Sequence, residues 1–294
     1  MTEPDEVDLH VEERGAGPIV ALAHGFGGSA RNFRREARAL QDRHRVVLWD
    51  ARGHARSAAP TDPALYTAEQ MVADVGRVLG LIREDGTAQA APSSGVSPAW
   101  GVRPSSSVPR VVVGGLSMGA GIALGYALAH PERVRALVLA AFPPGAREPR
   151  EGGLTQAEWA SSFADAIESK GLEAGAAEYA WGPRSGFDAA TAKRVRQGFL
   201  EHTPHGMEHV LRGVLATQRS AAELAPQLRA LRVPALVVAG AEDRLSRGPS
   251  EVLARALPGA RLVVIPGAGH VVNLDATAAF DRALREFLDG LPAA

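Results

Sequence analysis

The sequence predicts an α/β protein built on a mostly parallel sheet of seven to eight strands, with helices on both faces and a helical lid. Short apolar runs alternate along the chain with longer amphipathic ones, which is the order of strands and helices around a parallel sheet. The apolar runs are nearly unbroken, as expected for strands that helices cover on both faces. These runs are Pro18–Ala23, Arg45–Trp49, Arg110–Val113, Ala136–Ala140, Ala235–Ala239 and Arg261–Ile265.

A further strand is expected ahead of these runs. Val7, Leu9 and Val11 alternate with polar residues, and Gly15 and Gly17 then supply a turn. We expect this strand to form a hairpin with Pro18–Ala23. It brings the number of strands that can be placed to seven.

Amphipathic segments separate the predicted strands. The clearest helix is Thr67–Glu84, where Thr67 and Gln70 can form a capping box ahead of an apolar face. Three more helices are predicted after later strands, at Gly119–His130, Ser250–Leu257 and Asp275–Leu288.

Two stretches interrupt this alternation. Gly86–Pro109 is rich in Ser, Pro, Gly and Ala and has no periodicity, so we expect a flexible, removable insertion at 86–109. Residues 143–222 contain helical patterns at Thr155–Ser169, Thr191–Glu201 and Gly206–Arg219, but no convincing strand. We expect 143–222 to form a lid, and residues 1–142 and 223–294 to form the core. Ligands bind at the carboxyl ends of strands in open α/β sheets, so the lid should cover that end.

The composition argues against several classes of function. Of 294 residues, 32 are basic and 33 acidic, and the net charge of −1 argues against a nucleic-acid-binding protein. The chain has no cysteine, which excludes disulfides, thiolate metal sites and a cysteine nucleophile. No run of apolar residues is long enough for a transmembrane helix, and the polar start lacks a signal-peptide core, so we expect a cytoplasmic protein without membrane contact.

The strongest local motif is Gly115-Leu116-Ser117-Met118-Gly119, which follows a predicted strand and precedes a predicted helix. A serine on such a sharp turn needs small neighbours, and the turn presents its hydroxyl beside the helix N-terminus. The positive end of the helix dipole favours an oxyanion there. We therefore expect Ser117 to be a nucleophile.

A serine nucleophile needs a base, and the base needs an acceptor that fixes its tautomer. Asp243 follows the strand Ala235–Ala239, and His270 lies on a glycine-rich loop after Arg261–Ile265. Both groups therefore lie at the carboxyl ends of strands, as Ser117 does. We expect His270 to be the general base and Asp243 the acid, with Glu242 as the rival acid.

The segment His24-Gly25-Phe26-Gly27-Gly28 leaves a buried strand as a glycine-rich loop. Such a loop can bring backbone N–H groups close to a substrate. We expect the oxyanion hole to consist of the N–H groups of Phe26 and Met118. The ring of His24 is expected to bond loop backbone rather than to take part in chemistry.

Together these motifs resemble the α/β-hydrolase superfamily over nearly the whole chain. They are His24-Gly25, Asp50-Ala51-Arg52-Gly53, Gly115–Gly119, Gly240-Ala241-Glu242-Asp243 and Gly267-Ala268-Gly269-His270. The resemblance implies the α/β-hydrolase fold, eight strands and a structural role for the Asp50–Arg52 loop. The chain departs from the family pattern at Ala55, where a glycine is usual. Ser117 argues against the members that carry an aspartate nucleophile.

Other residues are weaker candidates. Phe142 and Trp181 are expected to line an apolar pocket, together with Phe163, Tyr179 and Phe187, although each can equally hold the lid to the core. Arg212 and Arg219 are candidate receptors for a substrate carboxylate. His202, His205 and His209 are expected to be solvated lid residues rather than metal ligands. No cofactor or metal is expected, the expected partner is a small-molecule substrate, and the oligomeric state is left open.

These observations favour hydrolysis of a carboxylic ester, lactone or thioester of a small to medium apolar substrate through an acyl-enzyme. Because the resemblance includes lid-bearing enzymes that cleave C–C bonds or eliminate pyruvate in menaquinone biosynthesis, a C–C bond hydrolase or such a lyase is the first alternative. A non-catalytic ligand receptor on the same fold is the second.

Overall fold

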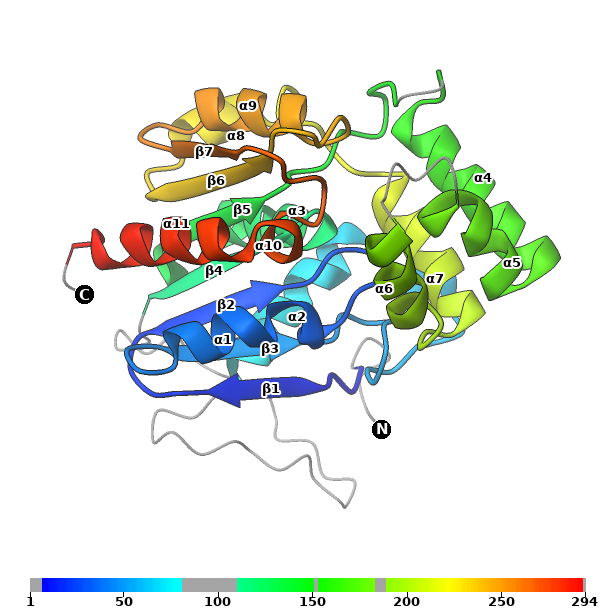
Figure 1. The fold of residues 1–294 in the computed structure, drawn as a ribbon, viewed down its shortest axis with the longest axis horizontal. Helices are drawn as coiled ribbons and strands as arrows, with labels where there is room; N and C mark the ends of the chain where they lie inside the picture. The colour runs from blue at the N-terminus through cyan, green and yellow to red at the C-terminus, as the bar shows by residue number, and fades with distance from the viewer. Residues whose placement is uncertain (1–6, 81–109, 151–152, 183–188, 293–294) are drawn as a thin grey trace, which may run out of the picture.

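A computed structural model of the protein describes residues 7–80, 110–150, 153–182 and 189–292. Its core is a seven-stranded sheet in the order β1-β3-β2-β4-β5-β6-β7 (Figure 1). All neighbouring strands are parallel except β1 and β3. The strands are β1 Val11–Arg14, β2 Ile19–Ala23, β3 Arg45–Trp49, β4 Val111–Leu116, β5 Val134–Ala140, β6 Ala235–Gly240 and β7 Arg261–Ile265.

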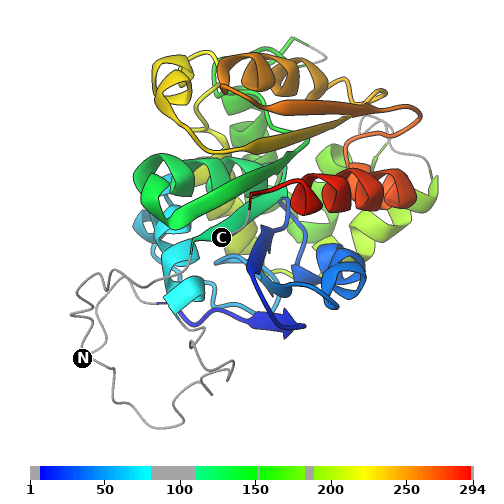
Figure 2. The ribbon, with the colours of Figure 1, turned by 90° about the vertical axis from the view of Figure 1, so that its left-hand side faces the viewer.

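Helices cover both faces of the sheet (Figure 2). One face packs against α1 (Arg34–Leu40) and α11 (Thr277–Asp289), and the other against α2 (Ala68–Gly80), α3 (Met118–Ala129), α8 (Ala225–Ala230) and α9 (Arg247–Ala256). Successive residues of β2 alternate between the two apolar clusters, because side chains of a strand point to opposite faces. The α/β class predicted from the unbroken apolar runs is therefore confirmed. The short helix α10 (Val272–Asp275) precedes α11.

The predicted hairpin between the first two strands is wrong. β1 pairs antiparallel with β3, and β3 pairs parallel with β2, so β3 lies between the two strands that are consecutive in the chain. The connection at Gly15 and Gly17 runs instead past the start of β3. A Cβ at Gly15 would lie 2.3 Å from the carbonyl oxygen of His44, and φ there is +78°, so only glycine fits this passage.

Between β5 and α8 the described residues form helices and no named strand. They are α4 Gln156–Lys170, α5 Leu172–Ala176, a π-helical turn Ala177–Trp181, α6 Ala189–Phe199, α7 Pro204–Val210 and a second π-helical turn Leu211–Leu215. We call these elements the cap helices. They lie beyond the carboxyl ends of the parallel strands (Figure 1). Short 3₁₀ helices at Ala30–Phe33, Pro63–Leu65 and Pro131–Arg133 complete the described elements.

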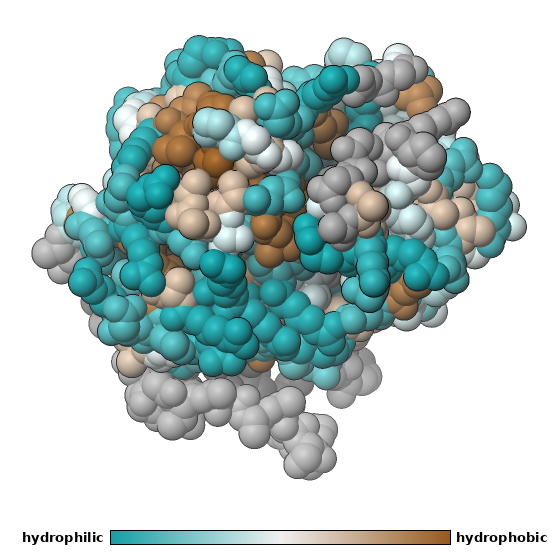
Figure 3. All heavy atoms as spheres, in the orientation of Figure 1, coloured by the Kyte–Doolittle hydropathy of each residue, from teal (hydrophilic) through white to brown (hydrophobic). Residues whose placement is uncertain are grey.

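The expected insertion 86–109 and Phe187 lie outside the described residues. In the described part of the chain, no helix combines the length and apolarity needed to cross a bilayer. Figure 3 shows a largely hydrophilic face with a hydrophobic area over β7, the edge strand, where Leu262 is 37% exposed.

Candidate active site

Ser117 occupies a strained turn between β4 and α3. Its φ of 54° and ψ of −115° lie in a region that favours glycine. The turn is held by the Ser117 N–H, which donates to the carbonyl of Ala140 at 2.9 Å. A Cβ at Gly119 would lie 2.2 Å from the carbonyl oxygen of Ala23, so the helix approaches β2 too closely for any side chain. A Cβ at Gly115 would lie 2.5 Å from the carbonyl carbon of Gly119, so both flanking glycines are needed for this packing.

Three side chains meet at this turn. Oγ of Ser117 lies 3.0 Å from Nε2 of His270, and Nδ1 of His270 lies 3.0 Å from Oδ2 of Asp243. They follow β4, β7 and β6, whose carboxyl ends share one edge of the sheet. The structure thus brings together the three residues expected to form a triad.

The Asp243 side chain is buried, with an exposed fraction of 3%. Burial opposes its ionisation, but the charge and hydrogen bond of His270 and two backbone N–H groups outweigh burial and lower the pKa of Asp243. Those N–H groups belong to Leu245 and Ser246, and both donate to Oδ1 at 3.1 Å. The rival acid Glu242 is exposed, and the structure does not place its carboxylate at His270.

Sequence reasoning missed one polar group beside the histidine. Ser246 is fully buried, and its Oγ lies 3.0 Å from Nδ1 of His270. The signal was present in the chain, because Ser246 is three residues after Asp243 and is the N-cap residue of α9.

The loop after β2 packs directly on the serine turn. A Cβ at Gly25 would lie 3.5 Å from the Cβ of Ser117. As predicted, the His24 ring bonds loop backbone: Nδ1 donates to the carbonyl of Gly25 at 2.8 Å, and Nε2 accepts from the N–H of Ala51 at 2.9 Å. Burial lowers the pKa of His24 to about 4, so the ring is neutral at neutral pH. Phe26 follows in this loop, and Met118 begins α3 on the other side of Ser117.

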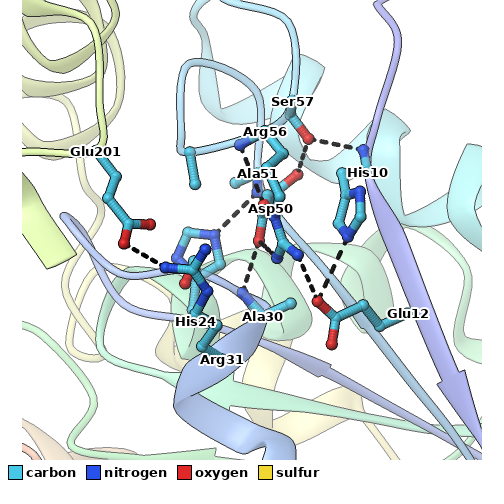
Figure 4. A network of polar contacts seen from close by, with 12 residues as sticks. His10, Glu12, His24, Ala30, Arg31, Asp50, Ala51, Arg56, Ser57 and Glu201 are labelled. Atoms are coloured by element: carbon cyan, nitrogen blue, oxygen red, sulfur yellow. Dashed lines mark hydrogen bonds and ion pairs between the residues drawn. The ribbon is translucent and has the colours of Figure 1, made fainter.

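A second loop supports the first through Asp50 (Figure 4). Its carboxylate accepts from the N–H of Ala30 at 2.7 Å and from Nε of Arg56 at 2.7 Å. Arg52 is fully buried and makes a bidentate ion pair with Asp74 at 2.7 Å. These buried hydrogen bonds and ion pairs hold the loop in place, which fits the structural role expected for it. Ala55, where the family has glycine, adopts φ of +44°.

Aromatic rings connect the cap helices to Phe26. Its ring lies 6.0 Å from that of Phe163 and 5.5 Å from that of Phe199, both edge-on. Trp181 is half-buried and packs edge-on against Phe199 at 5.6 Å. Phe142 is fully buried at the end of β5. Of the two apolar candidates, Trp181 therefore lies on the cap side of this cluster and Phe142 within the core.

The structure argues against Arg212 and Arg219 as receptors for a substrate carboxylate. The guanidinium of Arg212 donates to Asp165 at 2.7 Å, to Glu168 at 3.0 Å and to Glu208 at 3.2 Å, so three carboxylates already hold it. Arg219 is exposed and donates to the carbonyl of Glu223. Helical spacing placed the two arginines near each other but could not reveal these partners.

The prediction that the cap histidines are all solvated is wrong for His202. It is 6% exposed, and its Nδ1 accepts from the N–H of Ala55 at 2.7 Å. His205 and His209 bond the carbonyls of Ala59 and Thr61 at 2.9 and 3.2 Å. All three therefore fasten the cap to the loop after β3. No group of three or more residues suited to a metal ion occurs among the described residues.

Sequence reasoning also missed Arg150, a half-buried cation ahead of α4. It stacks 3.8 Å above the ring of Trp159 and donates to the neutral amide of Gln156 at 2.5 Å. Burial lowers the pKa of Arg150 to about 10, and the charge of Asp243 opposes that shift. Arg150 is therefore a half-buried cation whose contacts with Gln156 and Trp159 are to neutral groups.

Comparison with known proteins agrees with this architecture. Residues 20–283, most of the chain, match the model of the alpha/beta hydrolase family. A Bacillus subtilis protein named as a 2-succinyl-6-hydroxy-2,4-cyclohexadiene-1-carboxylate synthase is 26% identical, over 99% of this chain and 98% of its own length. A RutD carbamate hydrolase from Pseudomonas savastanoi is 28% identical, over 96% and 98%.

A solved structure also resembles this protein over the whole length of the chain. The thermophilic esterase of Thermogutta terrifontis superposes with a TM-score of 0.77 at 25% identity, covering 100% of this chain and 97% of the esterase.

Proposed function

Because the chain belongs to the alpha/beta hydrolase family, we propose that it is a serine hydrolase that cleaves a carboxylic ester, lactone or thioester. The observation that carries the proposal is the continuous hydrogen-bond path from Ser117 through His270 to Asp243, with both heavy-atom distances at 3.0 Å. This order of nucleophile, base and orienting acid is what acyl transfer requires.

The reaction follows from these positions. Nε2 of His270 takes the proton of Ser117 as Oγ attacks the substrate carbonyl, while Asp243 holds the Nδ1–H on the opposite side of the ring. The oxyanion is stabilised by the N–H groups of Phe26 and Met118. His270 then protonates the leaving alcohol or thiol, leaving an acyl group on Ser117. Finally His270 deprotonates a water molecule, which attacks the acyl carbon. The bond from that carbon to Oγ then breaks, the carboxylic acid leaves, and His270 returns the proton to Ser117.

The cap helices form a lid over this site and set its substrate range. Phe26, Phe163, Phe199 and Trp181 make up the aromatic cluster between the cap helices and the loop after β2. An apolar acyl or alcohol group of small to medium size suits such a lining. Excluding water from the site strengthens the contacts made by the oxyanion.

A second candidate is a C–C bond hydrolase or pyruvate-eliminating lyase acting on an anionic substrate. It is favoured by the Bacillus subtilis relative, which is named for making a carboxylate. Arg150 would then receive the anionic group, because this cation is half-buried and its partners Gln156 and Trp159 are neutral.

A fluorophosphonate probe and a substrate panel test the proposal. The probe should label Ser117, identified by mass spectrometry of the modified peptide, and Ser117→Ala should abolish labelling. Wild-type protein should hydrolyse esters, lactones or thioesters in a panel of graded acyl and alcohol lengths, and Ser117→Ala should lower kcat by about 10⁶-fold. A folded wild-type protein that neither labels nor turns over any member would instead favour a non-catalytic receptor.

A further inference from the structure

We propose that Ser246 is a positioning residue for His270, acting as a second acceptor for its Nδ1–H beside Asp243. This inference rests on the proposed function, in which His270 is the general base. It adds a fourth side chain to the three that the motifs indicate.

The two acceptors lie at equal distances from one nitrogen. Oγ of Ser246 and Oδ2 of Asp243 are each 3.0 Å from Nδ1 of His270. Ser246 is fully buried, so bulk water does not compete for its hydroxyl. The backbone N–H of Ser246 also donates to Oδ1 of Asp243 at 3.1 Å, so the serine contacts both partners of the pair.

The start of α9 explains why this hydroxyl is available. Ser246 is the N-cap residue, and an N-cap serine usually accepts from the N–H two or three residues further along. The third residue here is Pro249, which has no N–H, and the Ser246 side chain makes no capping bond. The hydroxyl turns toward His270 instead.

This arrangement restrains the imidazole ring. Nδ1 carries one proton, and two acceptors share it, so rotation away from one still leaves the other. When His270 becomes cationic during acyl transfer, both contacts become charge-assisted and stronger. When the carboxylate is removed, the hydroxyl is still within hydrogen-bond distance of Nδ1 and can restrain the ring.

Single substitutions test the positioning role. Ser246→Ala should lower kcat about fivefold and change KM less than twofold, since the strengthening of one hydrogen bond to cationic His270 is lost in a step after binding. Ser246→Thr, which keeps the hydroxyl, should recover most of that kcat. The matched control is Ser220→Ala, which removes another buried hydroxyl, one that caps a turn near the cap helices. Ser220→Ala should lower the free energy of unfolding and leave kcat unchanged.

A double-mutant comparison provides the sharper test. On an Asp243→Ala background, Ser246→Ala should cost a further tenfold or more, which exceeds its cost in the wild type, because the hydroxyl is then the remaining protein acceptor. Equal costs in both backgrounds, or no cost in either, would overturn the proposal.

A spectroscopic readout covers the case in which Asp243→Ala or Ser246→Thr does not fold. The downfield proton resonance of His270 Nδ1–H should shift between the wild type and Ser246→Ala, and an unchanged resonance would count against the contact. Failure of the proposed function is distinguishable, because Ser117 would then resist the fluorophosphonate in the wild type. Failure of this inference leaves wild-type labelling intact.

Discussion

Phe199 of α6 lies directly over Gly27: a Cβ at Gly27 would be 2.4 Å from Cδ2 of the Phe199 ring. Gly27 also has φ of +69°, which disfavours any other residue. Gly27→Ala should therefore lower the free energy of unfolding by about 2 kcal/mol and displace the neighbouring Phe26 N–H. We expect kcat to fall about tenfold or more, because a misplaced oxyanion donor stabilises the transition state poorly. Urea unfolding and ester kinetics measure the two effects.

Gly198→Ala is the matched control for that substitution. Gly198 precedes Phe199 within α6, and a Cβ there would meet the Gly27 carbonyl oxygen at an ordinary 3.7 Å. Alanine should raise the free energy of unfolding by about 0.5–1 kcal/mol and leave kcat unchanged. Loss of activity in both variants would mean that the contact between α6 and the loop after β2 tolerates no added methyl group on either side. The loss in Gly27→Ala could then not be assigned to the Phe26 N–H.

The strain at Ser117 predicts that, of two inactivating substitutions at this position, glycine gives a more stable protein than alanine. Glycine accepts φ of 54° and ψ of −115° without the cost that a Cβ imposes there. Ser117→Gly should therefore unfold at higher urea concentration than Ser117→Ala, by about 1 kcal/mol after the extra entropy of unfolded glycine is included. Neither variant should react with a fluorophosphonate. Equal stability of the two would mean that the surrounding structure relaxes when the hydroxyl is removed.

Glu36 predicts a pH-dependent stability. Its side chain is fully buried, Oε1 accepts from Asn273 at 3.2 Å, and burial raises the pKa to about 7 from an ordinary 4.5. A pKa raised by folding stabilises the protein below the unfolded pKa, and this contribution is lost as pH rises from 4.5 through 7.

Glu36→Gln removes that titration and isolates its effect. From pH 4 to pH 9 the free energy of unfolding of Glu36→Gln should gain on that of the wild type by about 3 kcal/mol. The buried histidines, such as His24, titrate in both proteins and cancel in the difference. A difference that stays constant with pH would show that Glu36 ionises as easily in the folded state as in the unfolded one.

Arg150 and Arg212 separate the two candidate functions. If the substrate is anionic, Arg150→Gln should raise KM for an ester carrying a free carboxylate by about 10- to 100-fold, and leave the neutral methyl ester within about twofold. Arg212→Gln should affect neither substrate, because its guanidinium is held by three carboxylates. If wild-type protein prefers the neutral ester and Arg150→Gln changes nothing, the second candidate fails.

Much of the framework could be predicted from the sequence because it depends on local pattern. The strands Arg45–Trp49 and Arg261–Ile265 were predicted with their observed bounds, since an apolar run between turns has few alternatives inside a parallel sheet. The neighbour of β1 was not predicted correctly, because alternation of apolar and polar residues identifies a strand without identifying the strand that pairs with it. The catalytic roles of Ser117, Asp243 and His270 remain proposals, although their side chains meet.

The errors at the site share one physical cause. Whether a polar side chain is buried depends on partners that are distant in the chain, and spacing within a helix does not reveal them. The buried ring of His202 accepts from Ala55, which is 147 residues away in the chain, and α4 supplies two of the carboxylates that hold Arg212. Ser246 was the exception: a serine three residues before a proline at a helix start was a readable sign of an uncommitted hydroxyl.

Because the triad residues are far apart in the sequence, activity depends on the last stage of folding. Ser117 follows a central strand, whereas His270, 153 residues further on, follows β7, which is both the last strand among the described residues and an edge of the sheet. A refolding molecule can bury β2, β4 and β5 against their helices before β7 docks, and such a molecule has a serine without its base. Contacts across so long a separation form slowly, because the loop between them must be closed first. Recovery of fluorophosphonate labelling after dilution from urea should therefore lag behind the recovery of helical signal, and the lag measures the arrival of the final strand.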